Sequence, residues 1–302
     1  MPKKQYIWID GKMAESRHSN VHVLTHSLQY GSGIFEGIRA YQTSAGPAIF
    51  RLKDHAKRFL NSAKIAGMNL GLAQADIEEA VKSVVRKNGI ASGYIRPFAF
   101  YNDSRIGLST LGKKVSVAVA AIEFGSYFDN KDKGVRCKVS SWHRPNSMIL
   151  PVEAKLSGNY ANSILASLEA KLAGFDEAIM LSSNGYVAEG PGENIFLVRD
   201  GALVTPSKDS DILLGITRDS ILKIAKQKGL PVEERPVHRE ELYSCDEAFF
   251  TGTAAEITPI VSIDSRQIGS GRPGAMTKAL WDAFSAIVHG NDPLYKGWLE
   301  YL

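Results

Sequence analysis

Along this chain the spacing of apolar residues changes repeatedly from strand-like to helical and back again. In the first part, Asp10-Gly11, a common hairpin turn pair, follows the apolar run 6–9, and Gly46-Pro47 separates the runs 34–41 and 48–51, which predicts a hairpin. We expect strands at 6–9, 34–41, 48–51, 94–101 and 115–124, and helices over 52–63 and 77–85. Strands that surround a block of helices predict an α+β domain.

The same alternation returns after a polar stretch at residues 125–134, which has no periodicity and is typical of a linker. We expect strands at 135–142, 177–181, 193–198, 203–204 and 249–250, and helices over 161–172, 217–228 and 276–287. A chain of 302 residues has room for about two domains. The sequence therefore predicts a small N-terminal domain at 1–124, a linker at 125–134 and a larger C-terminal domain at 135–302.

Composition narrows the class of function. The net charge is +4, and basic residues form no concentrated patch with interleaved aromatic residues, which argues against dedicated nucleic-acid binding. Cys137 and Cys245 lie far apart, so neither a zinc site nor a disulfide framework is expected. Residues 1–6 are polar, unlike a signal peptide, and no apolar run reaches the roughly 18 residues of a membrane span. We expect a soluble, cytoplasmic protein without a metal.

Two glycine-containing segments leave several interpretations open. Residues 30–39 resemble a phosphate loop, but the spacing is GxGxxxG and the segment continues into an expected strand. A tight turn is as good an interpretation as a binding loop. Residues 189–194, EGPGEN, place two carboxylates around two glycines, which fits a metal loop, a partner for a cationic ligand or a solvated turn.

Two further segments are suited to anions. Residues 214–218 lead into a helix, whose first N–H groups and dipole attract negative charge, although ordinary helix caps have the same composition. Residues 251–256 form a second turn whose N–H groups suit phosphate or carboxylate. His18, His22 and His26 are four apart, but no helical apolar stripe accompanies them, so we do not assign them a metal.

Taken in order, these segments resemble those of the branched-chain amino acid aminotransferases, which are fold type IV enzymes that use pyridoxal 5′-phosphate (PLP). The likeness extends over nearly the whole chain. It is carried by YGSGIFEGIRAY at 30–41, HAKRFLNSAKI at 55–65, YIRP at 94–97, SSW at 140–142, AKLSGNY at 154–160, EGPGENIF at 189–196, GITRDSI at 215–221 and TGTAAEITP at 251–259. The resemblance implies an α+β fold with a small N-terminal α/β sandwich and a larger C-terminal domain with a barrel-like sheet.

The resemblance also implies a covalent attachment point for the cofactor. Lys155 forms the Schiff base with the PLP aldehyde, and its freed amine moves a proton between the substrate Cα and the cofactor C4′. Glu189 faces the pyridine nitrogen and keeps it protonated. Tyr160 donates a hydrogen bond to the phenolic oxygen, and Leu214 packs on the ring. Glu193 and Asn194 contact the cofactor-binding residues and not the cofactor itself.

The remaining implied contacts belong to the phosphate and to the substrate. The phosphate is held by Arg58, Ile216, Thr217 and Thr253. The substrate α-carboxylate is held by Tyr94 and by the N–H groups of Thr253 and Ala254. The side-chain pocket is formed by Tyr30, Phe35, Gly37 and Tyr127. Arg96, two residues from Tyr94 and thus on the same face of a strand, meets the distal carboxylate of glutamate.

The implied enzyme is a branched-chain amino acid aminotransferase that exchanges amino groups between L-leucine, L-isoleucine or L-valine and 2-oxoglutarate by a ping-pong mechanism. Its implied partners are branched-chain amino acids, L-glutamate, 2-oxo acids and further copies of the chain, in a dimer or hexamer. Residues 103–112 match the family less well, so the range of amino donors is open. The alternatives are another fold type IV enzyme (a D-amino acid or amine transaminase, or aminodeoxychorismate lyase) and a non-catalytic protein that binds a phosphate ligand.

Overall fold

The structure is a computed structural model that describes residues 5–125, 127–128 and 133–302. Its contacts divide the chain into two compact units. The first unit comprises Met1–Gly125, Ala154–Gly158 and Ile287–Leu302, and the second comprises Ser126–Glu153 and Asn159–Ala286. The domain limits expected from the sequence (1–124, 125–134 and 135–302) stay a prediction, and residues 126 and 129–132 of the expected linker lie outside the described residues.

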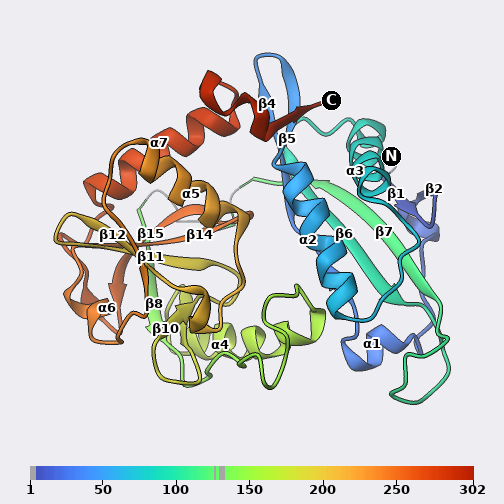
Figure 1. Cartoon of the computed structure of the whole chain (residues 1–302), viewed down its shortest axis with the longest axis horizontal. Helices are drawn as coiled ribbons and strands as arrows, with labels where there is room; N and C mark the ends of the chain where they lie inside the picture. Colours follow the sequence, from blue (N-terminus) through green and yellow to red (C-terminus); the bar gives the residue numbers. More distant parts are fainter. Residues whose placement is uncertain (1–4, 126, 129–132) are drawn as a thin grey trace. The chain divides into compact units, whose positions relative to one another are not determined.

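The first unit is built on an antiparallel sheet with the strand order β17-β5-β4-β6-β7-β1-β2, and β3 pairs with β6 beside β4. Its strands are β1 (Tyr6–Ile9), β2 (Lys12–Glu15), β3 (Ile34–Phe35), β4 (Ile38–Thr43), β5 (Gly46–Phe50), β6 (Gly93–Tyr101), β7 (Val115–Glu123) and β17 (Leu299–Tyr301). Its helices are α1 (His26–Tyr30), α2 (Leu52–Ile65) and α3 (Gln74–Asn88). Figure 1 shows α2 and α3 beside this sheet.

Helices α2 and α3 confirm the helical spacing read from the sequence. The apolar positions of α2 include Leu52, Ala56 and Phe59, and all three side chains are buried. Apolar residues of α3 are likewise buried, together with Ile38, Ile49 and Ile95 of the sheet, in one hydrophobic cluster. Burial stabilises the unit, because each Å² of apolar surface removed from water contributes about 25 cal/mol.

The second unit contains a closed ring of strands. Neighbouring strands follow the order β10-β9-β8-β15-β14-β11, and β10 also pairs with β11, which closes the ring. Parallel pairs join β8 to β9 and to β15, so the barrel is mixed. The strands of this unit are β8 (Val135–Val139), β9 (Glu177–Leu181), β10 (Val187–Glu189), β11 (Asn194–Arg199), β12 (Ala202–Pro206), β13 (Val232–Arg235), β14 (Glu247–Gly252), β15 (Glu256–Ile263) and β16 (Arg266–Gln267).

Helices connect successive strands of this unit. They are α4 (Tyr160–Leu172), α5 (Ile216–Gln227) and α6 (Glu241–Ser244), and α7 (Ala275–Val288) follows the last strand, with its final two residues in the first unit. Short 3₁₀ segments lie at Ser16–His18, Ser157–Asn159, Lys208–Ser210 and Pro293–Trp298. The barrel interior is a cluster of buried apolar side chains that includes Ile179, Ile195 and Phe250.

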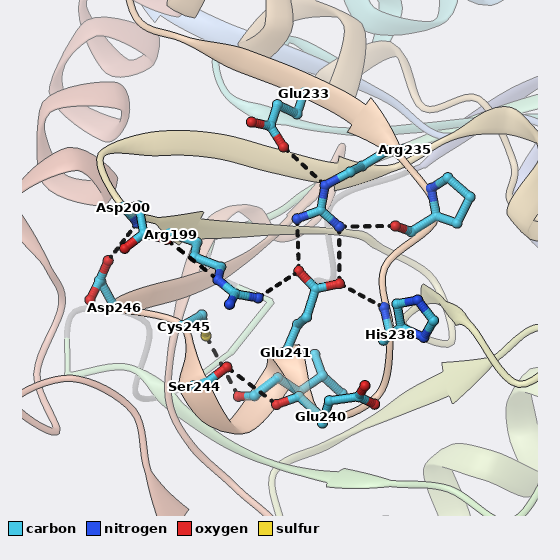
Figure 2. A network of polar contacts seen from close by, with 12 residues as sticks. Arg199, Asp200, Glu233, Arg235, His238, Glu240, Glu241, Ser244, Cys245 and Asp246 are labelled. Atoms are coloured by element: carbon cyan, nitrogen blue, oxygen red, sulfur yellow. Dashed lines mark hydrogen bonds and ion pairs between the residues drawn. The ribbon is translucent and has the colours of Figure 1, made fainter.

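A polar network around one buried carboxylate joins two strands of this unit to α6 (Figure 2). The carboxylate of Glu241 on α6 accepts two bonds from Arg235 of β13, at 2.9 and 2.7 Å, and one from Arg199 of β11 at 3.0 Å. The backbone N–H of His238 donates to the same carboxylate at 2.9 Å. The bonds from Arg235 lower the pKa of Glu241 to about 2, although burial acts in the opposite direction.

Three expectations from the sequence need correction. The second hairpin turns at residues 44–45, because Gly46 and Pro47 already belong to β5 and Gly46 pairs with Thr43. The strand expected at 135–142 ends at Val139. The apolar stripe that predicts α4 lies on its exposed side, where Ile164, Leu168 and Leu172 are found, while small side chains such as Ala166 face the core.

Membrane-spanning helices and metal-binding clusters are both absent from the described residues. Within residues 5–125, 127–128 and 133–302, no helix combines the length and the apolar character that crossing a bilayer requires. The same residues contain no group of three or more His, Cys, Asp or Glu side chains placed to hold a metal ion.

Candidate active site

Lys155 lies in a five-residue segment that belongs to the first unit and runs next to strand β3. Its backbone N–H donates to Ser62 Oγ of α2 at 3.0 Å, and its carbonyl accepts from the Phe35 N–H at 3.1 Å. The neighbouring Leu156 pairs with Ile34 in an isolated β-bridge. The backbone of the lysine is thus fixed by a helix and a strand. Its Nζ lies 4.9 Å from the centroid of the Phe35 ring.

The predicted substrate residues of the first unit lie close together beside this lysine. Arg96 Nη2 donates to the Tyr94 hydroxyl at 3.1 Å, as the two-residue spacing on β6 predicts. The Arg96 guanidinium also lies over the Phe35 ring, 4.6 Å from its centroid. At Gly37 an added Cβ would lie 2.0 Å from the Tyr94 hydroxyl oxygen, so this position requires glycine for the tyrosine to keep its place.

Tyr30 ends the short helix α1, which the sequence did not predict. Its ring packs against the buried ring of His26, with centroids 4.7 Å apart. His26 Nδ1 and Ser32 Oγ form a hydrogen bond of 2.7 Å. The helix ends at Gly31 in the left-handed region (φ 64°), where an added Cβ would lie 3.0 Å from Gly158 Cα. Gly31 therefore permits a close approach to the segment that carries Lys155.

Arg58, the predicted phosphate ligand, is partly buried and belongs to a cluster of polar side chains that we call the Glu36 cluster: Glu36, His55 and Arg58. Glu36 accepts from Arg58 Nε at 2.6 Å and from Arg58 Nη2 at 2.9 Å. His55 Nδ1 lies 2.7 Å from Glu36 Oε2. The carboxylate of Glu36 is completely buried, as is nearly all of His55.

The Glu36 cluster has a defined charge distribution. Burial would raise the pKa of Glu36, but Arg58 and His55 outweigh that effect and hold the pKa well below its usual range. Burial lowers the pKa of His55, and Arg58 and Lys155 add to that shift against the opposing effect of Glu36. The imidazole is therefore neutral near pH 7, which assigns the proton to Nδ1 as a donor to Glu36.

In the second unit, Glu189 is a buried carboxylate held from three sides. Arg144 Nη2 lies 3.0 Å from Oε1, Asn194 Nδ2 donates to Oε2 at 2.9 Å, and the Leu213 N–H lies 3.2 Å from both oxygens. The side chains of Arg144 and Glu189 are each only 6% exposed. The ion pair therefore fixes both the charge and the direction of this carboxylate.

The loop that leads into α5 is pressed against the same carboxylate. Asn194 Nδ2 donates to the Leu213 carbonyl at 2.8 Å, and an added Cβ at Gly215 would lie 2.0 Å from Asn194 Oδ1. Ile216 and Thr217 open the helix and are buried. The N-cap residue of α5 is Gly215, which has no side chain with which to cap the helix start. The helix dipole and first-turn N–H groups thus provide an anion site.

The turn between β14 and β15 approaches the same loops. Asn194 of β11 pairs with Thr251 of β14, and Gly252 lies against the backbone of Gly192 and Glu193. Thr253 and Ala254 form the turn that follows. Thr251 Oγ1 is buried and has no hydrogen-bond partner among the described residues. The second unit thus gathers loops 189–194, 213–217 and 251–255, which carry Glu189, Ile216, Thr217, Thr253 and Ala254.

The cofactor and substrate contacts predicted for three further residues of this unit stay predictions. Leu214 follows Leu213 in the Glu189 loop and is 42% exposed. Tyr160 is the first residue of α4. Tyr127 is about half exposed and packs edge-on against Phe128, with ring centroids 4.8 Å apart.

Residues that the sequence analysis missed are those that act through a partner. Glu36 lies between two strands, His55 lies on a helix, and Arg144 follows the SSW segment. The signal for Glu36 was a lone carboxylate between Phe35 and Gly37 in an apolar run. The SSW segment itself is hydrogen-bonded to α4, because Ser140 Oγ and the Ser141 N–H donate to Glu169 at 2.6 and 2.9 Å.

The residues present fit PLP. In the second unit, a buried carboxylate with fixed donors suits the pyridine N–H, and a helix start with glycine at its N-cap suits the phosphate. In the first unit, the Lys155 amine suits the aldehyde. At Gly215 a Cβ would displace Asn194, so the backbone at this helix start has no room for a side chain. These are the three features that a phosphorylated, nitrogen-containing aldehyde requires.

Comparison with known proteins identifies the class. Residues 33–263 match the family described as Amino-transferase class IV, so the chain belongs to the class IV aminotransferases. The chain is 45% identical over 294 residues to the branched-chain-amino-acid aminotransferase of Pseudomonas aeruginosa, an alignment that covers 97% of this chain and 95% of that protein. Within the class, the chain is therefore a member of the branched-chain amino acid aminotransferase family.

Solved structures give the same result. The branched-chain aminotransferase of Thermoproteus uzoniensis, solved with norvaline, superposes with a TM-score of 0.94 at 45% identity and 98% coverage of both chains. The Escherichia coli enzyme gives a TM-score of 0.96 at 42% identity and 99% coverage of both chains. A further branched-chain aminotransferase, solved with N-(5′-phosphopyridoxyl)-L-glutamate, gives a TM-score of 0.95 at 46% identity, covering 100% of this chain and 99% of that one. The expected fold type IV class is confirmed.

Proposed function

We propose that the chain is a PLP-dependent aminotransferase that moves the amino group of L-leucine, L-isoleucine or L-valine to 2-oxoglutarate by a ping-pong mechanism. The observation that carries this proposal is the full-length likeness to branched-chain aminotransferases, at 45% identity over 294 residues. The fixed Lys155 and Glu189 support it, because they supply the amine and the buried carboxylate that this chemistry needs.

We propose the following cofactor contacts. Glu189 would hold the pyridine N–H, and the N–H groups of Ile216 and Thr217 would hold the phosphate together with Arg58 and Thr253. Tyr160 would donate to the phenolic oxygen, and Leu214 would cover one ring face. When bound, PLP withdraws electrons from the substrate Cα and makes its C–H bond acidic.

In the proposed mechanism, Lys155 Nζ is the proton carrier. It accepts the proton from the substrate Cα and returns a proton on the cofactor side, which suits a primary amine on a flexible stem. The backbone of Lys155 is held at 3.0 Å by Ser62 and at 3.1 Å by Phe35. In this proposal the amine reaches the substrate Cα and the cofactor C4′ through rotations of the Lys155 side chain, while the backbone keeps its position.

The proposed substrate pocket must accept an alkyl group and a carboxylate in turn. Phe35 and the bare backbone of Gly37 provide apolar surface, and Tyr30 and Tyr127 are proposed to complete it. Arg96 provides the charge for glutamate, and its guanidinium lies on the Phe35 ring at 4.6 Å. Stacking on an aromatic face stabilises the cation when a branched alkyl group occupies the pocket. Tyr94 and the N–H groups of Thr253 and Ala254 would hold the α-carboxylate.

We also propose that the chain works as a homo-oligomer of at least two subunits in the cytoplasm. The exposed apolar side of α4, with Ile164, Leu168 and Leu172, supports an assembly because a stripe of this kind is costly in water. The buried, free thiols of Cys137 and Cys245 suit a reducing compartment. Sedimentation equilibrium of the purified chain tests the assembly, and a monomer at micromolar concentration would contradict it.

The activity is tested by the absorption spectrum of the purified chain reconstituted with PLP. We expect a visible band that bleaches on addition of L-leucine and returns on addition of 2-oxoglutarate, because each half-reaction changes the bound cofactor. A band that responds to D-alanine but not to L-leucine would assign a different substrate within the same class. Failure to bind PLP at all would refute the proposed function.

A further inference from the structure

The Glu36 cluster contains a carboxylate that the proposed reaction does not use. Glu36 lies between β3 and β4, with the proposed pocket residues Phe35 and Gly37 on either side of it in the sequence. Its backbone N–H donates to the Pro97 carbonyl at 2.9 Å, which fixes this segment to β6. Its side chain is completely buried and reaches α2, where it binds Arg58 and His55. One residue therefore connects the pocket strand to the proposed phosphate ligand.

We propose that Glu36 is a positioning residue that aims the Arg58 guanidinium at the cofactor phosphate. This inference rests on the proposed function, because it takes Arg58 as a phosphate ligand. Glu36 itself contacts neither phosphate nor substrate in this proposal. It acts only by fixing the direction of Arg58, with His55 fixing the direction of Glu36.

The geometry of the ion pair carries the argument. Arg58 meets Glu36 through Nε at 2.6 Å and Nη2 at 2.9 Å, which is the side-on fork in which both N–H bonds are parallel. A guanidinium has five N–H donors in one plane, so this pairing is compatible with a second anion on its other edge. An arginine side chain without a fixed partner loses conformational freedom when a ligand orders it. Glu36 removes that cost before the cofactor binds.

Charge and hydrogen bonding at His55 complete the arrangement. The neutral imidazole donates to Glu36 Oε2, the oxygen that also accepts from Arg58 Nη2. The carboxylate therefore has fixed donors on both sides and cannot rotate. Since the imidazole carries no charge near pH 7, the cluster is one cation paired with one anion. Its contribution to phosphate binding must come from the direction of the donors more than from excess charge.

The experiment compares PLP with pyridoxal, which lacks the phosphate, as ligands of the apo protein. Their dissociation constants are measured by absorbance titration in the wild type, Glu36→Gln, Arg58→Ala and the double variant. Glutamine keeps the size but offers one acceptor oxygen where the fork needs two. We expect Glu36→Gln to lower the preference for PLP over pyridoxal about tenfold, the range of one charge-assisted hydrogen bond. In the Arg58→Ala background, the same change should have almost no effect.

Each other outcome has a definite meaning. An unchanged preference in Glu36→Gln, or an equal loss of PLP and pyridoxal binding, would overturn the positioning role. An equal effect of Glu36→Gln with and without Arg58 would overturn it too. An unchanged preference in Arg58→Ala would remove the phosphate ligand and the role of Glu36 with it. Absence of PLP binding in the wild type would refute the proposed function itself.

Two further variants separate positioning from general loss of structure. Glu241→Gln makes the same chemical change at another buried carboxylate that binds arginine, and it should leave the preference for PLP unchanged. Glu36→Asp keeps the negative charge but shortens the side chain by one methylene. It replaces Glu36→Gln in the experiment if that variant does not fold. We expect Glu36→Asp to show an intermediate preference, and a preference equal to that of the wild type would contradict the need for the side-on fork.

Discussion

At Lys155 the backbone is held in place by hydrogen bonds to a helix and to a strand. Lys155 donates from its main chain to Ser62 Oγ and accepts from Phe35, so its Cα has a defined position. Its Nζ lies over the Phe35 ring at 4.9 Å, where the aromatic face stabilises a cation. Residue identity at this position decides the chemistry, while the fold around it depends mainly on backbone hydrogen bonds.

Lys155→Ala should therefore abolish transamination and leave the protein folded. Loss of the general base alone reduces rates by about 10²–10⁴, and loss of the covalent link to PLP adds to that. Steady-state rates with L-leucine and far-ultraviolet circular dichroism measure the two effects. Lys82→Ala, which removes a partly buried lysine paired with Glu300, is the matched control. Turnover within about tenfold of the wild type would refute the assignment.

Arg144 is predicted to matter for stability as well as for the site. Arg144→Met leaves the buried carboxylate of Glu189 without its cation, and an uncompensated buried charge costs roughly 3–5 kcal/mol. Urea unfolding of the apo protein measures this loss. Arg136→Met breaks an ion pair with Asp176 at the surface, 57% exposed on the arginine side, and should cost less than about 1 kcal/mol. Equal losses of unfolding free energy in the two variants would show that the buried ion pair of Arg144 contributes no more than a surface ion pair.

Sequence reasoning reached the residues that carry their own signature. Glu189 and Asn194 belong to a glycine-containing segment, and Thr217 belongs to a recognisable helix start. Arg144 and His55 carry no such signature, because an arginine in a loop and a histidine on a helix are ordinary. Their importance comes from partners on other elements, at least 19 residues away in the chain, which only the tertiary structure brings within 3.0 Å.

At the scale of elements, the packing at the start of α5 depends on the absence of a side chain at Gly215. Gly215→Ala would place a Cβ 2.0 Å from Asn194 Oδ1 and displace the side chain that binds Glu189. We expect a loss of about 1–3 kcal/mol in urea unfolding and weaker PLP binding. Gly192→Ala, with no described heavy atom within 4 Å of the added Cβ, should change stability by about 0.5 kcal/mol or less. A Gly215→Ala protein as stable as Gly192→Ala would contradict this packing.

Elements with strong periodicity were predicted from the sequence, and very short ones were not. Helix α5 was expected over 217–228 and runs over Ile216–Gln227. Strands β10 and β17 have three residues each, too few to show an alternation, and they exist because neighbouring strands offer them an edge. The exposed apolar side of α4 shows the limit of periodicity, which predicts a helix but not the direction of its apolar side.

At the scale of the whole molecule, stability should depend on acid through Glu241. Its pKa falls from 4.5 to about 2 on folding, so its contribution is complete above pH 4.5 and is lost as the pH falls through 2. The shift corresponds to about 3 kcal/mol. Glu241→Gln should therefore be less stable than the wild type at pH 7, and the gap should close near pH 2. A gap that stays constant between pH 7 and pH 2 would contradict this account.

The fold class, with its barrel-like sheet, could be predicted from the sequence, but the strand pairing that closes the barrel could not. Alternating spacing marks the strands, and the likeness to fold type IV enzymes implies a barrel-like sheet. The pairing of Glu189 with Asn194, which joins β10 to β11, is a single contact that no spacing predicts. It also brings the carboxylate beside the asparagine that orients it, so the same contact closes the sheet and builds the site.

The chain passes between its two units at residues 125–126, 153–154, 158–159 and 286–287. A ribosome releases residues in order, so the sheet of the first unit must wait with its β5 edge open until Leu299–Tyr301 has been synthesised. The lysine segment arrives long before that edge strand does. Throughout the synthesis of the second unit, newly made protein therefore exposes the β5 edge that β17 covers in the finished sheet, and an unpaired strand edge is a known starting point for aggregation.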